Sequence, residues 1–105
     1  MPPTLFEKRV YNVCKCIPKG KLATYKDIAN ALNTGAYRAV GNALNKNPNW
    51  PKVPCHRVVN SDGRVGGFAR GKGEKINLLK QEGIEVKHGK ISNLSQYLVR
   101  LRRKR

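Results

Sequence analysis

Apolar residues recur at helical spacing near the start of the chain. Over residues 5–16 they predict a first helix with one buried face, formed by Leu5, Phe6, Val10, Val13 and Cys14. The proline and glycine of Pro18-Lys19-Gly20 end this helix. Thr24 then precedes a second helical stretch, and Asp27 follows it by three residues, which is a helix-capping pattern. A second helix is therefore predicted over about 25–32.

A third helix is predicted beyond the break at Asn33-Thr34-Gly35. Its inner stripe is expected to be Ala36, Ala39, Val40, Ala43 and Leu44, which follow helical spacing. Two short helices joined by a glycine-containing turn form a helix-turn-helix. The opposite face carries one cation, two small amides and a residue without a side chain, namely Arg38, Asn42, Asn45 and Gly41. Such a face is able to approach a nucleic-acid backbone closely, although it also suits an ordinary solvated face.

Short extended pieces, turns and one more long helix are predicted for the second half of the chain. Val53 and Val58-Val59 are expected to be buried and extended, and residues 60–63 form a turn. Residues 64–68 continue as either a strand or a glycine-rich loop. A helix over 73–82, a hairpin over 84–91 and a short amphipathic helix over 94–101 follow. Together these elements predict a mainly α fold with short β pieces, typical of a winged helix-turn-helix-like DNA-binding domain.

The charge balance narrows the class of partner. The 105 residues contain 22 Lys and Arg against 6 Asp and Glu, which leaves a formal net charge of +16. Such an excess costs self-repulsion, so a polyanion is expected to bind: nucleic acid first, with an anionic membrane surface as the alternative. No stretch approaches the roughly 20 apolar residues of a membrane span, and the start lacks the apolar segment of a signal peptide. We therefore expect an intracellular monomer, cytoplasmic, or nuclear in a eukaryote.

Reactive side chains are concentrated in the stretch Pro54-Cys55-His56-Arg57-Val58-Val59. A thiol is a weak nucleophile near its ordinary pKa of about 8.5, and an adjacent base or cation shifts it toward the thiolate. The alternative is that Cys55 is a small buried apolar residue beside an exposed basic pair. Cys14 and Cys16 lack the spacing of a zinc or redox motif, so we expect them to be helix or core residues and predict no metal site.

Glu82 is the acidic residue that calls for an explanation. It shares a face of the helix over 73–82 with Lys75, Leu78 and Leu79, and it lies in the last turn, before Gly83. There the helix dipole disfavours an anion by roughly 0.3–1 kcal/mol. A cationic or imidazole partner is therefore expected inside, and His56 is the obvious candidate. The alternative is a solvated glutamate at a frayed helix end.

These residues, taken jointly, resemble a known family. A cysteine followed by His-Arg-Val, Asn47 eight residues before it, Glu82 27 residues after it and a preceding helix-turn-helix are similar to the active-site domain of the O6-alkylguanine-DNA alkyltransferases. The match runs from about Leu5 to Val86. The resemblance implies DNA repair by one irreversible transfer of an alkyl group from guanine O6 to Cys55, on double-stranded DNA and without a cofactor. We expect this DNA-binding and active-site domain over residues 1–91 and a basic C-terminal helix or tail over 92–105.

The resemblance also implies a role for each matching residue. Cys55 is the acceptor, His56 acts through a water as its base, Glu82 orients and charges His56, and Asn47 braces the turn. The guanine pocket is expected to involve Tyr25, Val58, Phe68, Ala69 and Lys75. DNA contacts are expected from Tyr25 and Arg38, which drive and replace the flipped nucleotide, and from Lys26, Asn33, Asn42 and Ser61.

Three departures from the family pattern keep other functions open. The family's common N-terminal domain is not matched, so support for the active site is expected from this chain or from a partner. Phe68 stands where a tyrosine is usual, and Ala69 and Arg70 replace smaller or polar residues of the pocket. The main alternative is an alkyltransferase-like protein that binds the lesion without efficient transfer, although such relatives lack the acceptor cysteine. A plain helix-turn-helix regulator with an inert Cys55 and a cysteine hydrolase are further alternatives.

Overall fold

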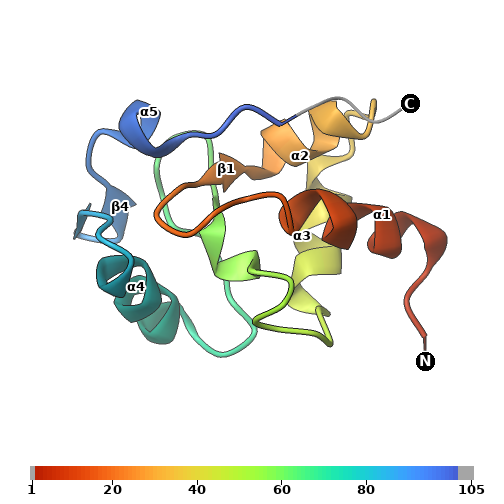
Figure 1. Ribbon diagram of the computed structural model, residues 1–105, viewed down its shortest axis with the longest axis horizontal. Coiled ribbons are helices and arrows are strands. Elements are labelled where there is room, and N and C mark those ends of the chain that lie inside the picture. Colours follow the sequence, from red (N-terminus) through yellow and green to blue (C-terminus); the bar gives the residue numbers. More distant parts are fainter. Residues whose placement is uncertain (1, 102–105) are drawn as a thin grey trace.

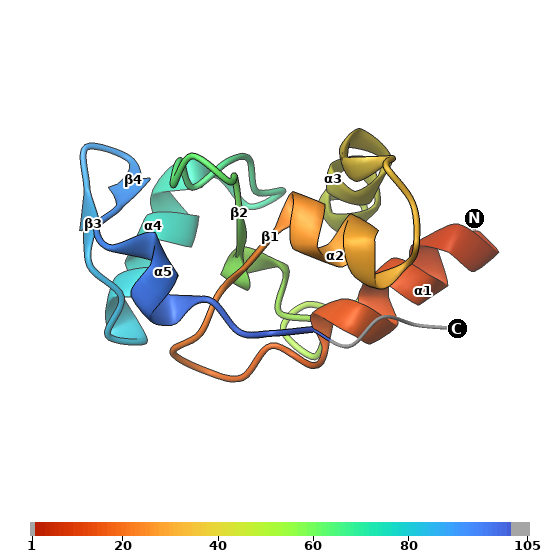
Figure 2. The same cartoon turned by 90° about the horizontal axis from the view of Figure 1, so that it is seen from above.

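Three helices lie together at one end of the molecule in the computed structural model, which describes residues 2–101 (Figures 1 and 2). They are α1 (Leu5–Cys14), α2 (Tyr25–Ala31) and α3 (Tyr37–Asn45). Local sequence determines where two of them begin, because Thr4 with Glu7 and Thr24 with Asp27 form complete capping boxes. The predicted helix-turn-helix is therefore present as α2 and α3.

The other end of the molecule is built from the second half of the chain. It holds α4 (Lys72–Gln81), the antiparallel pair β3 (Val86–Lys87) and β4 (Lys90–Ile91), and the short helix α5 (Leu94–Tyr97), as Figure 2 shows. Between the two ends, β1 (Ala23–Thr24) pairs in parallel with β2 (Val58–Val59). The predicted mainly helical fold with short strands is confirmed.

The core has two clusters that meet at β2. Because successive side chains of a strand point to opposite faces, Val58 packs with the α1–α3 cluster and Val59 with the cluster beneath α4 and the hairpin. Both valines have no exposed surface. Cys55 belongs to the first cluster, and the 3-10 turn Cys55–Arg57 leads directly into β2. The reactive stretch thus lies at the junction of the two clusters.

Several local burial predictions are wrong. Leu5, expected on the buried face of the first helix, is 67% exposed in the first position of α1. Ala36 and Ala39 are also exposed, because α3 begins only at Tyr37 and buries the side chains of Val40, Ala43 and Leu44. Cys16 is an exposed residue of the turn after α1, whereas Cys14 is buried. Sequence periodicity alone does not show which apolar residues at a helix end remain outside.

The amphipathic helix predicted over 94–101 ends after one turn at Tyr97. Leu98 then forms a parallel bridge with Leu22, whose N–H donates to Tyr97 O and whose carbonyl accepts from the Val99 N–H. This pairing satisfies backbone groups next to β1 that a continued helix would leave unpaired. Residues 92–101 are therefore packed on the domain, and the basic end over 102–105 lies outside the described residues.

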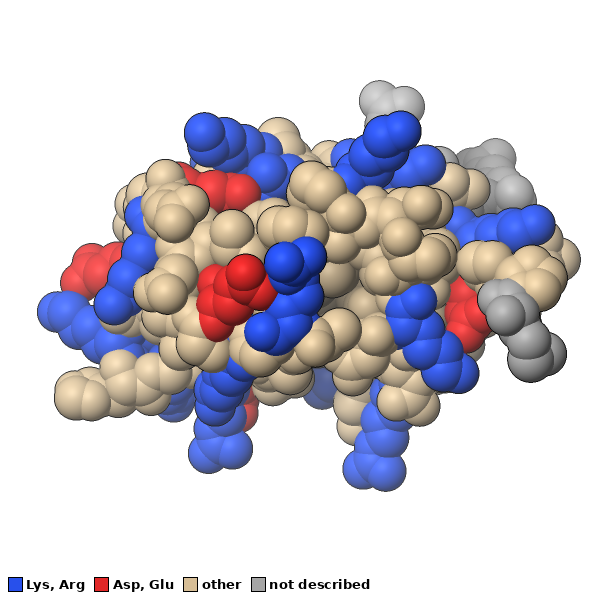
Figure 3. Space-filling model, turned by 90° about the horizontal axis from the view of Figure 1, so that it is seen from below, with Lys and Arg blue, Asp and Glu red and all other residues tan. Residues whose placement is uncertain are grey.

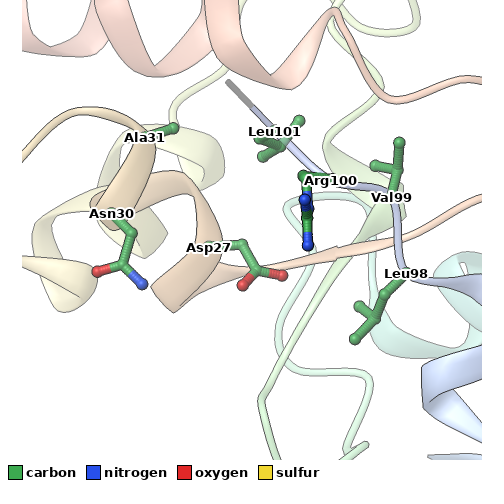
Figure 4. A pocket seen from close by; sticks show the side chains of 7 residues that line it. All are labelled: Asp27, Asn30, Ala31, Leu98, Val99, Arg100 and Leu101. Carbon is green, nitrogen blue, oxygen red and sulfur yellow. The ribbon is translucent and has the colours of Figure 1, made fainter. Parts of the chain in front are cut away.

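A hollow of about 440 Å³ lies between α2 and the segment that follows α5 (Figure 4). Its lining combines apolar and polar side chains: Asp27, Asn30, Ala31, Leu98, Val99, Arg100 and Leu101. None of these residues belongs to the reactive stretch. Within residues 2–101, no helix is long and apolar enough to cross a membrane.

Candidate active site and nucleic-acid interface

Cys55 lies in a turn that its neighbours hold in place. The Cys55 backbone N–H and the Asn47 side-chain amide both donate to the Val53 carbonyl, each at 2.8 Å. Asn47 in turn accepts a hydrogen bond from the Asn49 N–H at 2.9 Å. Asn47 thus links the loop after α3 to the start of the 3-10 turn. Its contacts are those that bracing this turn requires.

The Cys55 thiol is almost enclosed, with 6% of the residue exposed. Burial raises its pKa, while hydrogen bonding by the Asn47 side chain and the positive charge of Lys75 act in the opposite direction. The resting form in this environment is therefore the neutral thiol. Reaction at Cys55 requires an acceptor for the thiol proton.

His56 forms hydrogen bonds through both ring nitrogens. Its Nε2 lies 2.8 Å from Glu82 Oε2, and its Nδ1 lies 3.1 Å from the indole nitrogen of Trp50. Because an indole N–H only donates, Nδ1 is the acceptor and Nε2 carries the proton that is donated to Glu82. Burial of His56, which is 3% exposed, lowers its pKa, and the hydrogen bond to Glu82 opposes that shift. The imidazole is therefore neutral in one defined tautomer.

Glu82 is held by more groups than the sequence indicated. Arg57 donates from Nε to Oε1 and from Nη2 to Oε2, both at 2.9 Å, and the Gly20 N–H donates to Oε1 at 3.2 Å. Although burial raises the pKa of Glu82, the hydrogen bonds from Arg57, His56 and Gly20 outweigh it and lower the pKa to about 2. Arg57 also donates to the Ile17 carbonyl at 2.9 Å. The carboxylate is thus ionised and fixed in orientation by a bidentate arginine.

Lys75 is a buried cation of α4 that contacts the end of the reactive stretch at Val58. It projects from α4, has no exposed surface, and donates to the Val58 carbonyl at 2.7 Å and the Gly67 carbonyl at 3.2 Å. Its Nζ also lies 3.4 Å from the Tyr25 hydroxyl. Burial lowers the pKa of Lys75 to about 7, and a negative charge on Cys55 would raise it. No carboxylate accepts a hydrogen bond from this ammonium group among residues 2–101.

A groove runs beside α3, and we refer to its two adjoining hollows as the α3 groove. One, of about 380 Å³, is lined by Tyr25, Tyr37, Arg38, Gly41, Asn42, Asn45, Asn60, Gly66 and Gly67. The other, of about 240 Å³, is lined by Tyr25, Lys26, Tyr37, Asn60, Ser61 and Asp62. Tyr25 belongs to both hollows and reaches Lys75 with its hydroxyl, so it connects the groove with the surroundings of Cys55. Burial raises the Tyr25 pKa to about 12.

Gly66 permits this connection. Its φ is +77°, and a Cβ added there would lie 2.9 Å from the Tyr25 hydroxyl. A side chain at this position would therefore collide with Tyr25 as well as strain the backbone. The Val65-Gly66-Gly67 stretch is a loop in the structure, which resolves the two alternatives left open for residues 64–68.

The residues predicted to contact DNA or the guanine lie in different surroundings. Four of the expected DNA contacts, Lys26, Arg38, Asn42 and Ser61, line the α3 groove with Tyr25. Asn33 is exposed in the turn between α2 and α3 and does not line it. Of the residues expected around the guanine, Val58 and Lys75 are fully buried, Phe68 is half-buried and Ala69 is exposed.

Sequence reasoning missed two polar contacts of this site. Arg57 was considered only as a neighbour of Cys55, and its ion pair with Glu82 was not predicted. The excess of cations over six acidic residues is the signal that could have indicated it, because a buried carboxylate in such a chain is expected to meet a cation. The prolines and asparagines around Trp50 indicate a loop, and nothing in that pattern indicates its bond to His56. Tyr37 and Asn60 of the groove were also missed. Within residues 2–101 no group of three or more His, Cys, Asp or Glu side chains is arranged to hold a metal ion.

Comparison with known proteins places this geometry in a family. The model of the family described as 6-O-methylguanine DNA methyltransferase, DNA binding domain, matches residues 5–84, which include every element from α1 to α4. The chain belongs to this family. A methylated-DNA--protein-cysteine methyltransferase of Methanosarcina acetivorans is 49% identical over 81 residues, covering 76% of this chain and 52% of the relative. The chain thus spans about half the length of curated methyltransferases that it matches.

Two solved structures of similar fold differ in how much of them the chain covers. The O6-methylguanine-DNA methyltransferase of Pyrococcus kodakaraensis strain KOD1 is 49% identical with a TM-score of 0.70, and the match covers 77% of this chain and 47% of that one. S. pombe Atl1, crystallised in complex with damaged DNA containing O6-carboxymethylguanine, is 31% identical with a TM-score of 0.82. The Atl1 match covers 95% of this chain and 99% of Atl1. Identity is higher to the methyltransferase, whereas the extent of the fold agrees with Atl1.

Proposed function

We propose that this protein repairs DNA by transferring an alkyl group from guanine O6 to its own Cys55, once per molecule. The observation that carries the proposal is a cysteine located directly before a hydrogen-bonded His56–Glu82 pair, inside the stretch matched by the methyltransferase family. A nucleophile, a base and an acid that orients the base form the arrangement used to activate thiols and hydroxyls. In this proposal all three residues act at one alkylated base.

The transfer forms an S–C bond and breaks the bond between the alkyl carbon and guanine O6. Cys55 loses its proton, the sulfur electron pair attacks the alkyl carbon, and the electrons of the broken bond stay with the guanine, which takes up a proton. His56 accepts the thiol proton through a water, and the Glu82 carboxylate, kept ionised by Arg57, stabilises the resulting imidazolium. Because water does not displace the thioether product, each molecule reacts once.

The residues around Lys75 support a pocket for the flipped base. Lys75 supplies a positive charge near Cys55 that favours the thiolate. Tyr25 and Phe68 offer aromatic surface for the base, and the exposed backbone near Ala69 offers polar groups. Val58 has no exposed surface, and its carbonyl accepts a hydrogen bond from Lys75, so in this proposal it acts by holding Lys75. Asn47 keeps the Cys55 turn in position for attack.

Double-stranded DNA is the partner that the rest of the surface supports. Lys and Arg side chains are distributed over the face shown in Figure 3, with few acids between them, and the formal net charge is +16. The α3 groove presents Arg38, Asn42, Lys26 and Ser61, and Asn33 lies at the turn before α3. We propose that α3 enters the minor groove and that Arg38 takes the place of the flipped nucleotide. In this proposal the protein acts as a monomer in the compartment that contains the DNA, which is the cytoplasm or, in a eukaryote, the nucleus.

A second candidate function has its own support. The match with S. pombe Atl1 covers almost the whole of both chains, and the DNA bound to Atl1 contains O6-carboxymethylguanine, an O6-alkylated guanine. A protein that binds O6-alkylguanine in DNA without efficient transfer is therefore the alternative. Cys55 favours transfer, because binding alone needs no thiol.

Intact mass after incubation with a duplex containing O6-methylguanine tests the proposal. Transfer adds one methylene, about 14 Da, to the wild type and nothing to the Cys55→Ala variant. Peptide mapping provides an internal control, because Cys14 and Cys16 should remain unmodified. No gain in mass together with preferential binding of the lesion duplex would favour the alternative. No gain in mass together with equal binding of lesion and plain duplex would contradict both functions.

A further inference from the structure

The single tryptophan of the chain donates a hydrogen bond to the ring nitrogen of His56 that could accept a proton. Trp50 lies in the loop between α3 and Cys55, and its indole N–H donates to His56 Nδ1 at 3.1 Å. The other ring nitrogen, Nε2, bears the proton shared with Glu82. Nδ1 therefore holds the one lone pair of the imidazole, and Trp50 occupies it. As long as this bond persists, neither the thiol proton nor a bridging water has access to that lone pair.

The position of the indole is set by groups from different parts of the chain. The Phe68 ring meets it edge-on at 6.1 Å between centroids, and the His56 ring does so at 6.0 Å. The guanidinium of Arg70 lies 4.8 Å from the centroid of the Trp50 ring and is itself paired with Glu74 at 2.9 Å. A cation over the face of an indole is a favourable arrangement. The hydrogen bond to His56 therefore has packing support on several sides.

We propose that Trp50 is a positioning residue that locks the resting site: it holds His56 with its proton on Nε2 and withholds Nδ1 from the thiol proton of Cys55 until the indole moves. The inference rests on the proposed function, because it concerns the base of that reaction. When the indole leaves, the Cys55 proton passes to Nδ1, directly or through one water. His56 becomes an imidazolium whose Nε2–H still donates to Glu82, and the sulfur keeps its electron pair for attack.

The charges around His56 both favour and disfavour its protonation. Glu82, at the end of α4, favours an imidazolium, whereas Arg57, in the same 3-10 turn as His56, and Lys75 of α4 disfavour it. Cys55 would add a favourable negative charge as the thiolate. An imidazolium would also turn an N–H toward the indole N–H, so that two donors face each other. Trp50 thus adds a specific and removable obstacle to protonation of His56.

The reactivity of Cys55 toward iodoacetamide, without DNA, tests the lock. The protein carries Cys16→Ser so that this exposed thiol does not react, and mass mapping follows Cys55 between pH 6 and 9. Trp50→Phe keeps an aromatic ring beside Phe68 and Arg70 but removes the N–H. We expect Cys55 to react about three- to tenfold faster at neutral pH in Trp50→Phe, which is the worth of one ordinary hydrogen bond. The same substitution in a His56→Gln background should leave the rate of that background unchanged.

Two outcomes of this cycle overturn the lock. An unchanged or lower rate in Trp50→Phe contradicts it, and an equal acceleration in the His56→Gln background shows that the smaller ring merely opened access to the thiol. A measurement on the wild type stands independently of the variant's folding: in the ¹⁵N NMR spectrum His56 Nδ1 should be unprotonated and coupled to the single indole N–H. A protonated Nδ1 contradicts the lock. Neither readout involves DNA or alkyl transfer, so failure here is distinct from failure of the proposed function.

Discussion

Two charged residues near Cys55, one in α4 and one at its end, hold their charge in opposite ways, and we call their surroundings the carboxylate side (Glu82) and the lysine side (Lys75). On one side, Glu82 accepts hydrogen bonds from Arg57, His56 and the Gly20 N–H, and these lower its pKa to about 2. On the other side, Lys75 donates to carbonyl groups and a hydroxyl, and burial lowers its pKa to about 7. The carboxylate side is complete before any reaction begins. The lysine side has no carboxylate partner within residues 2–101, and a Cys55 thiolate would supply a negative charge there.

This difference assigns distinct tasks to the two sides. A carboxylate that is charge-balanced and rigid positions the imidazole at little cost in reorganisation. A buried ammonium without a counter-charge is destabilising in the resting protein and becomes favourable when negative charge develops next to it. The first side orients groups, and the second side responds to the chemistry. Substitutions on the two sides should therefore have different signatures.

Loss of the Glu82 charge should have the largest effect. Glu82→Gln leaves the half-buried Arg57 and the buried His56 without their anion, so we expect the free energy of unfolding to fall by about 3 kcal/mol and transfer to slow by at least roughly 100-fold. Urea unfolding and single-turnover kinetics measure the two effects. Because the folded pKa of Glu82 is lowered, its stabilisation is full above about pH 4.5 and is lost as the pH falls toward 2.

Glu74 offers a matched control for that prediction. Glu74 belongs to α4, the helix that ends just before Glu82, and its carboxylate forms a solvent-exposed ion pair with Arg70. Glu74→Gln removes this ion pair, and such pairs contribute at most about 1 kcal/mol. The wild type and Glu74→Gln should both lose stability between pH 4.5 and 2, whereas Glu82→Gln should lack the Glu82 part of that loss. Equal stability of Glu82→Gln and Glu74→Gln at neutral pH would mean that the carboxylate side is not a charge-balanced network.

The sequence predicted features that depend on neighbouring residues better than contacts between distant parts of the chain. The start of α2 follows from Thr24 and Asp27 alone, because a capping box is completed within four residues. The His56–Glu82 pair was predicted because an anion on the inner face of a helix end requires a partner. The bond from Arg57 to the Ile17 carbonyl and the bond from Trp50 to His56 were not predicted. Such contacts depend on how loops fold over the core, which periodicity does not encode.

A long-range contact also explains why α5 is shorter than predicted. Leucines and Tyr97 at helical spacing predicted a helix over 94–101, but Leu98 instead pairs with Leu22 from the start of the chain. A tertiary backbone pairing therefore overrode a local preference.

A side chain at Gly66 should push Tyr25 away from Lys75 and lower the stability by less than loss of the Glu82 charge does. Gly66→Ala places a Cβ 2.9 Å from the Tyr25 hydroxyl in a backbone of φ +77°, so we expect a loss of roughly 1–3 kcal/mol in the free energy of unfolding. The displaced Tyr25 should also weaken binding of lesion duplex. Gly67→Ala is the control, because a Cβ there meets no atom within 4 Å and the backbone is not strained. The prediction fails if both variants unfold at the same urea concentration.

Removal of the Lys75 charge should change how stability depends on pH rather than the stability at one pH. The folded pKa of Lys75 is lowered to about 7, so above about pH 7 the unfolded chain binds more protons at this residue, and Lys75 contributes a rise in stability of up to about 1.4 kcal/mol per pH unit. Above about pH 9 the raised pKa values of the buried Cys14 and Cys55 act in the opposite direction in all three proteins. Lys75→Met has no such proton and should lack this rise. Lys80→Met, which replaces an exposed lysine of the same helix, should keep it. Urea unfolding of the three proteins at pH 7, 8 and 9 measures the slopes. A rise of equal size in Lys75→Met would show that Lys75 stays fully charged in the folded protein, and the contrast between the carboxylate side and the lysine side would then disappear.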